Sequence, residues 1–417
     1  MTSHNTPRQT QSRTEAQYAA EQTKIQTYTT LQSSLLSHIS TSGYTYNPEA
    51  FALTTKILRL NPEYYTVWNV RRRLLADGLL SKRSSGSSPS TVLPTTSATS
   101  DTLGSSGSSS SYQEGGETPV SRESPGTEKG GRSGLQLEKT QQDDAAQESS
   151  TAQKNDQKVL TDELQFTIPL LLASPKCYWI WNYRRHILSE SIFRLPTPVA
   201  RRIWLEELGL DSQMLTRDRR NFHAWGYRRY VLGMLESKEL DGKSMVEEEF
   251  KFTTDKIKGD LSNFSAWHSR SRLIPRLLDE RQAGNQERRS FLEEELAFIH
   301  DALNVGPEDQ SLWFYHQFLM ASFTPGNEQY AIVTDFSTTE KIDHLAQEIA
   351  EIKELAEDYD DVKWIYEALV EYTVTLGQLR KLENEEETDL RGWLGRLRKL
   401  DPMRQGRWDD LEASWKL

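Results

Sequence analysis

Four arginines recur at one position of a repeated pattern and are the most conspicuous candidates for chemistry in this chain. Each follows a tryptophan by three residues, and a histidine takes that position in a fifth copy. A row of guanidinium groups could bind phosphate, because the planar fork of arginine matches phosphate as well as carboxylate. Recurrence in every copy favours structural pairing with carboxylates or helix C-termini instead. The copies are Trp68/Arg71/Leu75, Trp181/Arg184/Leu188, Trp225/Arg228/Leu232, Trp267/Arg270/Ile274 and Trp313/His316/Met320.

Other reactive groups are sparse. Cys177 is the single cysteine, which excludes an intrachain disulfide and a cysteine-based metal site. The eight histidines show no paired-histidine metalloprotease pattern, and the sequence has no glycine loop of the kind that holds phosphates. We therefore expect no metal site and no complete catalytic apparatus in this chain alone.

The spacing of the repeated residues predicts the elements that carry them. Offsets of three, four and seven residues lie on one face of an α-helix, because a turn takes 3.6 residues. Asn61-Pro62 and Ser174-Pro175 predict where two of these helices begin, since a capping oxygen followed by proline suits a first turn. Each copy is thus a predicted helical hairpin, and its first helix is an apolar-periodic segment at 50–60, 161–173, 200–216, 246–261 or 288–304.

Successive tryptophans from Trp181 to Trp313 lie 44, 42 and 46 residues apart. This period is typical of stacked helix pairs and exceeds the roughly 34 residues of tetratricopeptide repeats. Such hairpins bury their apolar faces only by stacking, which creates an extended concave surface. We expect an all-α fold, an α-solenoid that forms a crescent superhelix, in which Trp364 marks a degenerate sixth copy.

Composition predicts four segments along the chain. Residues 1–21 are expected to form a flexible tail, 22–83 the first helical repeat region, and 159–417 the remaining repeats and C-terminal helices. Between them, 84–158 is rich in Ser and Gly and has few large apolar residues. Such a segment cannot bury enough surface to offset its ordering entropy, so we expect a disordered insertion.

The global charge excludes some partners. A net charge of −11 argues against nonspecific binding to nucleic acid or to anionic membranes. No apolar run approaches the length of a membrane span, and the first residues lack the hydrophobic region of a secretory signal. We expect a cytoplasmic protein with no integral membrane segment and no nucleic-acid partner.

Three of the repeats, read in full, resemble those of protein prenyltransferase α subunits. They are NPEYYTVWNVRR at 61–72, PKCYWIWNYRR at 175–185 and RNFHAWGYRR at 220–229. The resemblance runs from about residue 22 to the C-terminus, apart from the insertion. It is strongest to the Rab geranylgeranyltransferase (type II) branch in its compact form, without immunoglobulin-like or leucine-rich domains. The segments that resemble this branch are 221–223, 263–268, 309–316, 400–404 and 407–411.

The resemblance implies an obligate heterodimer with a β subunit that holds the isoprenoid pocket and the catalytic zinc. The enzyme would transfer geranylgeranyl from geranylgeranyl diphosphate to C-terminal cysteines of Rab GTPases that an escort protein presents. Lys176 matches the family position that contacts the diphosphate, whereas Tyr178, Asn221, Phe222 and His223 match positions that line the subunit interface. His4, near the N-terminus, could reach the partner's zinc as a self-inhibitory ligand, since neutral imidazole is a good zinc donor.

Two alternatives stay open at this point. The first is the α subunit shared by farnesyltransferase and type I geranylgeranyltransferase, against which Phe222 and the 401–404 ending weigh. The second is a noncatalytic helical-repeat scaffold, against which the Trp–Arg signature and the longer period weigh.

Overall fold

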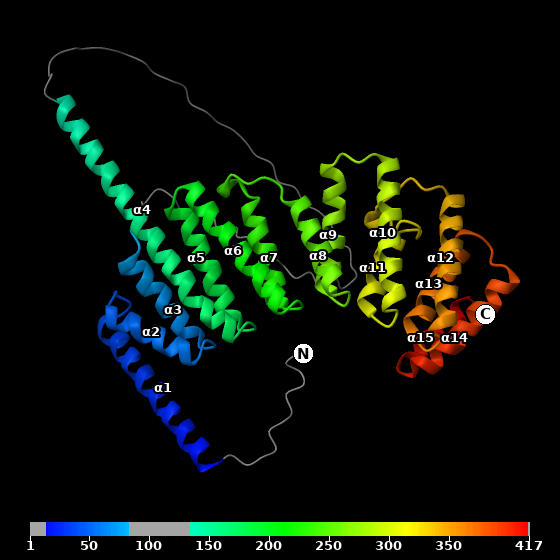
Figure 1. Ribbon diagram of the computed structural model, residues 1–417, viewed down its shortest axis with the longest axis horizontal. Coiled ribbons are helices and arrows are strands. Elements are labelled where there is room, and N and C mark those ends of the chain that lie inside the picture. The colour runs from blue at the N-terminus through cyan, green and yellow to red at the C-terminus, as the bar shows by residue number, and fades with distance from the viewer. Residues whose placement is uncertain (1–13, 83–133, 416–417) are drawn as a thin grey trace, which may run out of the picture. The chain divides into compact units, whose positions relative to one another are not determined.

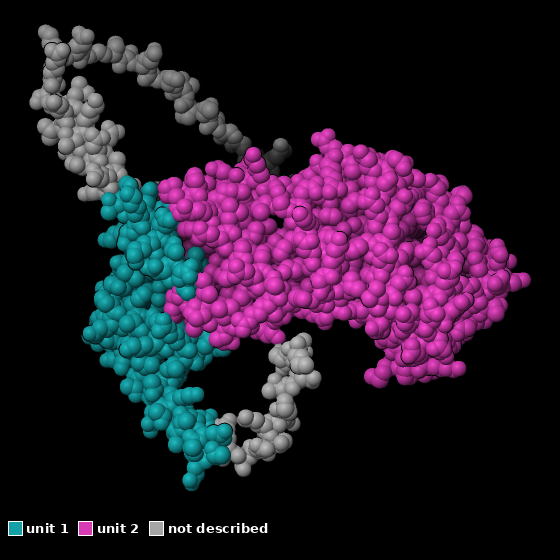
Figure 2. All heavy atoms as spheres, in the orientation of Figure 1, with its two compact units in different colours: residues 1–165, 193–195 teal, residues 166–192, 196–417 magenta. Residues whose placement is uncertain are grey.

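The structure, a computed structural model, describes residues 14–82 and 134–415, with the backbone alone over 134–149. These residues form fifteen α-helices and contain no β-strand (Figure 1). They divide into two compact units, coloured separately in Figure 2: residues 1–165 with 193–195, and residues 166–192 with 196–417.

The first unit contains α1 (Glu15–Ser42), α2 (Pro48–Leu60), α3 (Tyr65–Leu74) and the greater part of α4 (Gly134–Ala173). Asn47 caps α2 by accepting hydrogen bonds from the backbone N–H groups of Glu49 and Ala50, and Pro48 takes the first helical position. Helices α2 and α3 form the hairpin of the first repeat, and a π-helical turn at Leu75–Leu79 follows α3.

The second unit contains the C-terminal part of α4 and the remaining hairpins. In sequence order its helices are α5 (Tyr178–Arg194), α6 (Thr197–Arg217), α7 (Phe222–Leu235), α8 (Val246–Gly259), α9 (Phe264–Glu280), α10 (Asn285–Val305), α11 (Gln310–Met320), α12 (Thr338–Asp358), α13 (Lys363–Leu379), α14 (Asn384–Leu400) and α15 (Gln405–Trp415). Consecutive helices pair as α6–α7, α8–α9, α10–α11 and α12–α13, and α11 also packs against both α9 and α13. The predicted all-α solenoid of helical hairpins is confirmed.

The signature tryptophans tie the start of each second helix to the turn before it. All five are buried, and each indole N–H donates to the backbone carbonyl six residues earlier. These bonds measure 2.6–2.9 Å and join Trp68 to Pro62, Trp181 to Pro175, Trp225 to Arg219, Trp267 to Leu261 and Trp313 to Pro307. A buried indole N–H without such a partner would destabilise the fold. Because the carbonyl accepts this hydrogen bond, tryptophan can be buried at this position.

The sixth hairpin repeats this contact with a different residue from the one predicted. Tyr366, three residues into α13, donates to the carbonyl of Asp360, again six residues earlier, at 3.1 Å. Trp364 is only half-buried. The choice of Trp364 as the sixth signature residue was therefore wrong, because the register of α13 gives the position to Tyr366.

The predicted helix starts were early. Helix α3 begins at Tyr65 and α5 at Tyr178, so Asn61-Pro62 and Ser174-Pro175 lie in the preceding turns. In those turns, the carbonyls of Pro62 and Pro175 accept the indole N–H groups.

Two segment boundaries also need correction. Helix α1 begins at Glu15, inside the predicted tail, and α4 begins at Gly134, inside the predicted disordered insertion. The segment 134–158 is polar, yet it is rich in Gln, Glu, Lys and Ala, which are good helix formers. Asp156, which is 1% exposed, accepts hydrogen bonds from the backbone N–H and the hydroxyl of Ser81, so this end of the segment is packed. Residues 84–133 lie outside the described residues.

No helix among the described residues combines the length and the apolar character that crossing a bilayer requires.

Candidate functional site

The candidate residues Lys176, Tyr178, Asn221, Phe222 and His223 lie at the N-terminal ends of α5 and α7. We call this set the α5–α7 edge. Lys176 is exposed in the turn between α4 and α5, and Tyr178 is the first residue of α5. The sequence had suggested the first turn of a helix for Lys176, whereas the helix begins two residues later.

Asn221 fixes the relative position of the two helix ends. Its side-chain oxygen caps α7 by accepting from the backbone N–H groups of His223 and Ala224, at 3.0 and 3.3 Å. Its amide donates to the carbonyl of Pro175, next to Lys176, at 3.1 Å. Asn221 is 2% exposed, so it acts as a buried brace between the turn and the helix.

Asn263 shows that this brace belongs to the repeat. It caps α9 through the N–H of Ala266 at 3.2 Å, and its amide donates to the carbonyl of Arg219 at 3.1 Å. Because Asn263 makes the same contacts one hairpin later, packing accounts for the presence of an asparagine at position 221.

The other side chains of the edge face solvent around this brace. Phe222 is 76% exposed and Tyr178 is 52% exposed, whereas His223 is half-buried. The ring of His223 is near both, with its centroid 5.9 Å from that of Phe222 and 6.5 Å from that of Tyr178. The structure thus brings together the five residues of the edge from two segments about 45 positions apart.

Exposed aromatic residues recur at the first position of the second helices. In the second unit these are Tyr178, Phe222 and Phe264, the last of which is 49% exposed. Phe264 lies beside Phe314, which is 45% exposed, at the mouth of a pocket between α9 and α11. Tyr65 holds the same position at the start of α3 and is 53% exposed. Rings exposed at one register are typical of a surface that a protein partner covers.

The repeated arginines are buried and paired. Each guanidinium joins a Ser or Thr on the first helix of its own hairpin to a Glu on the first helix of the next hairpin, and we call this arrangement the arginine staple. The four staples are Arg71 with Thr54 and Glu163, Arg184 with Thr167 and Glu207, Arg228 with Ser212 and Glu249, and Arg270 with Thr254 and Glu295. All four arginines are at most 4% exposed, so they form structural crosslinks and are not a phosphate ladder.

Tyrosines reinforce two of these staples. Tyr227 donates to Glu207 at 2.7 Å, and Tyr315 donates to Glu295. Burial, together with the adjacent Glu207, raises the pKa of Tyr227 well above its ordinary value. The phenol therefore stays a hydrogen-bond donor throughout the physiological pH range.

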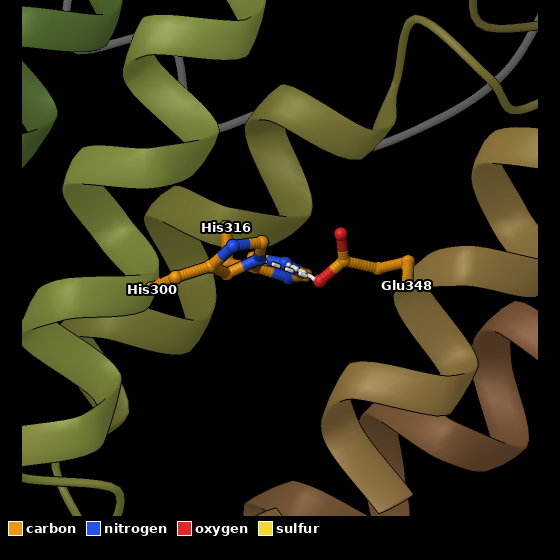
Figure 3. Close-up of side chains that lie close together, drawn as sticks. All are labelled: His300, His316 and Glu348. Atoms are coloured by element: carbon orange, nitrogen blue, oxygen red, sulfur yellow. Dashed lines mark hydrogen bonds and ion pairs between the residues drawn. The ribbon is translucent and has the colours of Figure 1, made fainter. Parts of the chain in front are cut away.

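The fifth repeat replaces the staple with histidines. His316 takes the arginine position on α11, and His300 on α10 lies 16 residues earlier, the separation found between Ser212 and Arg228. Figure 3 shows both rings directed at Glu348 on α12. The Nε2 atoms of His300 and His316 lie 2.8 and 2.7 Å from the same carboxylate oxygen of Glu348.

Within the described part of the chain, His300, His316 and Glu348 form the one group that could hold a metal ion. The sequence had predicted no metal ligands, and it marked His316 only as a variant of the repeat. His300 was not predicted from the sequence. The repeat did offer a signal for it, since His300 stands where other hairpins place the Ser or Thr of the staple.

Two further residues were singled out in the sequence, Cys177 and His4. Cys177 is buried at 2% exposure in the turn before α5. His4 lies outside the described residues.

Known proteins resemble this chain both in its repeats and over most of its length. A model of the protein prenyltransferase alpha subunit repeat matches residues 47–77, 160–191, 204–235, 246–277 and 292–323, which correspond to the five signature hairpins. The geranylgeranyl transferase type-2 subunit alpha of Schizosaccharomyces pombe is 30% identical over 296 residues, which cover 60% of this chain and 84% of that protein. The protein of the same name from Candida albicans is 25% identical, over 94% of this chain and 91% of its own length.

A mammalian relative and a solved structure extend the comparison. The rat geranylgeranyl transferase type-2 subunit alpha is 38% identical over 165 residues, which span 26% of its length. The solved Candida albicans protein geranylgeranyltransferase-I, complexed with GGPP, matches with a TM-score of 0.51 and 18% identity over 92% of this chain and 89% of that one. At that identity, the structural likeness concerns the fold alone.

Proposed function

We propose that this chain is the α subunit of a Rab geranylgeranyltransferase heterodimer. The chain belongs to the protein prenyltransferase alpha subunit family and, within it, to the geranylgeranyl transferase type-2 alpha subunits. The complete enzyme would transfer geranylgeranyl from its diphosphate to C-terminal cysteines of Rab GTPases. This chain would contribute the docking surface for the β subunit and one edge of the diphosphate site. Such an enzyme would act in the cytoplasm, which is where we expect this chain to work.

The observation that carries this proposal is the α5–α7 edge. Its exposed cation, Lys176, lies two residues before the exposed Tyr178, in the turn that Asn221 joins to the start of α7, where Phe222 is exposed. Apolar rings at the N-termini of successive second helices provide area that a partner can bury. A lysine at the margin of such a surface would become partly desolvated in the assembled enzyme, where its charge acts more strongly than in water.

The chemistry expected of this chain is stabilisation of negative charge. As the bond between the isoprenoid carbon and the diphosphate oxygen breaks, charge accumulates on the departing diphosphate. The ammonium of Lys176 would offset that charge, and a preorganised cation of this kind contributes about 3 kcal/mol when water is excluded. The brace of Asn221 would hold the turn that carries Lys176 against α7.

The remaining roles are divided between the β subunit and this chain. A zinc ion on the β subunit would lower the pKa of the substrate thiol and so supply the attacking thiolate. His223 and Tyr178 would position the isoprenoid diphosphate or the substrate peptide at the interface. The acidic surface of this chain is suited to a basic escort protein.

A prenylation assay tests the proposal. The chain is co-expressed with candidate β subunits and offered farnesyl or geranylgeranyl diphosphate. Two acceptors are compared, a Rab with its escort protein and a short peptide with a C-terminal CaaX sequence. We expect geranylgeranylation of the escorted Rab alone. Modification of the CaaX peptide would instead assign the chain to the α subunit shared by the other two prenyltransferases, and the absence of any β-subunit complex would leave a noncatalytic scaffold.

A further inference from the structure

We propose that His300, His316 and Glu348 form a binding site for a divalent transition-metal ion, in the first instance zinc, within the fifth and sixth hairpins of this chain. The three ligands come from α10, α11 and α12 (Figure 3). The site is separate from any metal of the β subunit, and it does not depend on the proposed enzymatic function.

The donor atoms already converge. One ring nitrogen of each histidine and one oxygen of Glu348 all lie within 4.8 Å of one another. Ligands of a tetrahedral zinc ion, each about 2.0 Å from the metal, lie about 3.3 Å apart. The present separations of 2.7 and 2.8 Å from the carboxylate oxygen therefore need to widen by only about half an ångström. A rotation of the Glu348 side chain provides that movement.

The other ring nitrogens are held as they are in metal sites. The Nδ1 of His316 lies 2.7 Å from the hydroxyl of Tyr372, and the Nδ1 of His300 lies 3.1 Å from a carboxylate oxygen of Glu351. Metal-binding histidines usually place their second nitrogen against such a partner, which orients the ring and fixes its tautomer. Both rings thus present Nε2 to the same oxygen of Glu348 from the paired helices α10 and α11.

The charge balance also favours a bound cation. In the fourth repeat, the permanent charge of Arg270 faces Glu295, with Thr254 completing the staple. In the fifth repeat, two histidines, which carry no permanent charge, face the carboxylates of Glu348 and Glu351. The fifth repeat therefore lacks the permanent cation of the arginine staple. It still has one carboxylate there, that of Glu348, and it adds a second, that of Glu351. A zinc ion restores that charge and replaces the two Nε2 protons.

The site is shielded but accessible from one side. His316 is 0% exposed and Glu348 is 6% exposed at the side chain, whereas the side chain of His300 is 26% exposed. An ion can enter past His300, and three protein ligands leave a fourth position for water. Binding would tie α12 to α10 and α11, so it would stabilise the stacking of the last hairpins.

Cobalt substitution tests the site directly. The full-length chain, purified without a histidine tag, is titrated with Co²⁺ and followed by visible absorption. We expect saturation at one equivalent with the intense bands of tetrahedral coordination, loss of those bands on addition of Zn²⁺, and a higher unfolding temperature with zinc. If wild-type chain takes up no cobalt or zinc, and its stability is indifferent to both, the proposal fails and the cluster holds only protons.

The repeat itself supplies the matched control. The double variant H300T/H316R installs the Thr and Arg that the fourth repeat carries at these positions, so it should keep a folded staple and lose cobalt binding. His268, which is exposed on α9, provides the opposite control, and His268→Asn should bind as the wild type does. Equal cobalt binding by H300T/H316R and wild type would overturn the assignment.

Two further variants keep the test decisive if the double variant misfolds. Glu348→Gln removes a ligand with little change in volume, and Tyr372→Phe removes only the support of His316. We expect Tyr372→Phe to weaken zinc binding about tenfold. If a β subunit is required for expression, elemental analysis should find one zinc fewer per heterodimer in H300T/H316R than in wild type, and equal zinc content would contradict the site.

Discussion

Helices α5 and α7 carry two regions of different character within two turns of each other. At their N-terminal ends lie the exposed residues of the α5–α7 edge, and less than two turns further along lie the buried Arg184 and Arg228. The buried position is occupied by arginine in four repeats. The position of Lys176, five residues before the tryptophan, holds Glu63, Arg220, Ser262 and Glu308 in the other signature repeats.

This difference gives a criterion for distinguishing structural residues from functional residues in a repeat protein. A residue that every hairpin uses in the same contact is explained by stacking, as the arginine staples and the braces of Asn221 and Asn263 show. A residue found in one hairpin alone, such as Lys176, has no such explanation. The contrast predicts that substitutions in the buried region change stability, whereas those at the edge change activity.

The largest effect is expected from breaking a buried staple. Arg184→Ala removes one partner of an ion pair in which Arg184 is 2% exposed and Glu207 is 3% exposed. The stranded carboxylate should destabilise the chain by about 3–5 kcal/mol, measured by urea unfolding.

Arg276 provides the control for this experiment, because its pair with Glu236 is 43% exposed at the arginine side chain. Arg276→Ala should lose less than about 1 kcal/mol. If the two variants lose similar amounts, burial does not distinguish the staples from ordinary surface ion pairs.

The next effect is on catalysis. Lys176→Ala should lower the rate of geranylgeranyl transfer by the assembled enzyme about a hundredfold at saturating lipid, with unfolding and subunit association unchanged. Lys243, an exposed lysine on a loop, supplies a control, and Lys243→Ala should leave the rate as it is. Unchanged turnover in Lys176→Ala would remove this residue from the mechanism.

A paired comparison at the braces sharpens the contrast further. Asn221→Ala and Asn263→Ala each remove a helix cap and one additional hydrogen bond, so each should lose about 1–2 kcal/mol of stability. In the enzyme assay, only Asn221→Ala should also slow transfer, because it loosens the turn that carries Lys176. Equal rates for the two variants would show that the position of this turn is irrelevant to activity.

The last effect concerns the pH dependence of stability, through a buried acid beside the Arg228 staple. Asp211 is 0% exposed and lies 3.5 Å from Arg228, and its burial raises the pKa of its carboxyl to about 8 despite that guanidinium. Because the folded chain binds this proton more tightly, the stability it contributes is complete below about pH 4 and is lost as the pH rises through about 8.

Asp211→Asn should therefore be more stable than wild type at pH 8, because the stability of the wild type falls as the pH rises from about 4 to about 8, and the difference should vanish toward pH 4. Thermal unfolding of both chains across this range measures it. The exposed Asp255 is the reference position, since Asp255→Asn should follow the wild-type pH profile. A constant offset between Asp211→Asn and wild type at every pH would mean that Asp211 does not titrate as described.

Some features of the fold could not be read from local patterns. The polar segment after residue 133 looked disordered because it has little to bury, yet its residues favour helix and its far end packs through Asp156. Trp364 looked like the sixth signature residue because of its type. The start of α13 gives the position to Tyr366, and a helix start depends on packing as well as on sequence.

The residues of the α5–α7 edge lie near one another, although their role in the enzyme stays a prediction. Lys176, Tyr178, Asn221, Phe222 and His223 were all named from the sequence, and the structure gathers them at one edge. The contact between His300 and His316 was not predicted, because residues on two different helices approach only when the hairpin closes. Only a comparison with the other repeats, in which Ser212 or Thr254 lies 16 residues before the arginine, would have paired the two histidines.

The sequence by itself determined the helices, the hairpin repeat and the faces on which tryptophan and arginine lie. These follow from a periodicity of 3.6 residues, which is a local property of the chain. Only the tertiary structure decided which carboxylate each arginine meets, and Arg71 and Glu163 are 92 positions apart. It also decided that Asn221 reaches Pro175 and that two histidines share Glu348. Such pairings depend on how one hairpin stacks on the next, and the many acidic residues of this chain make the partner ambiguous until that stacking is known.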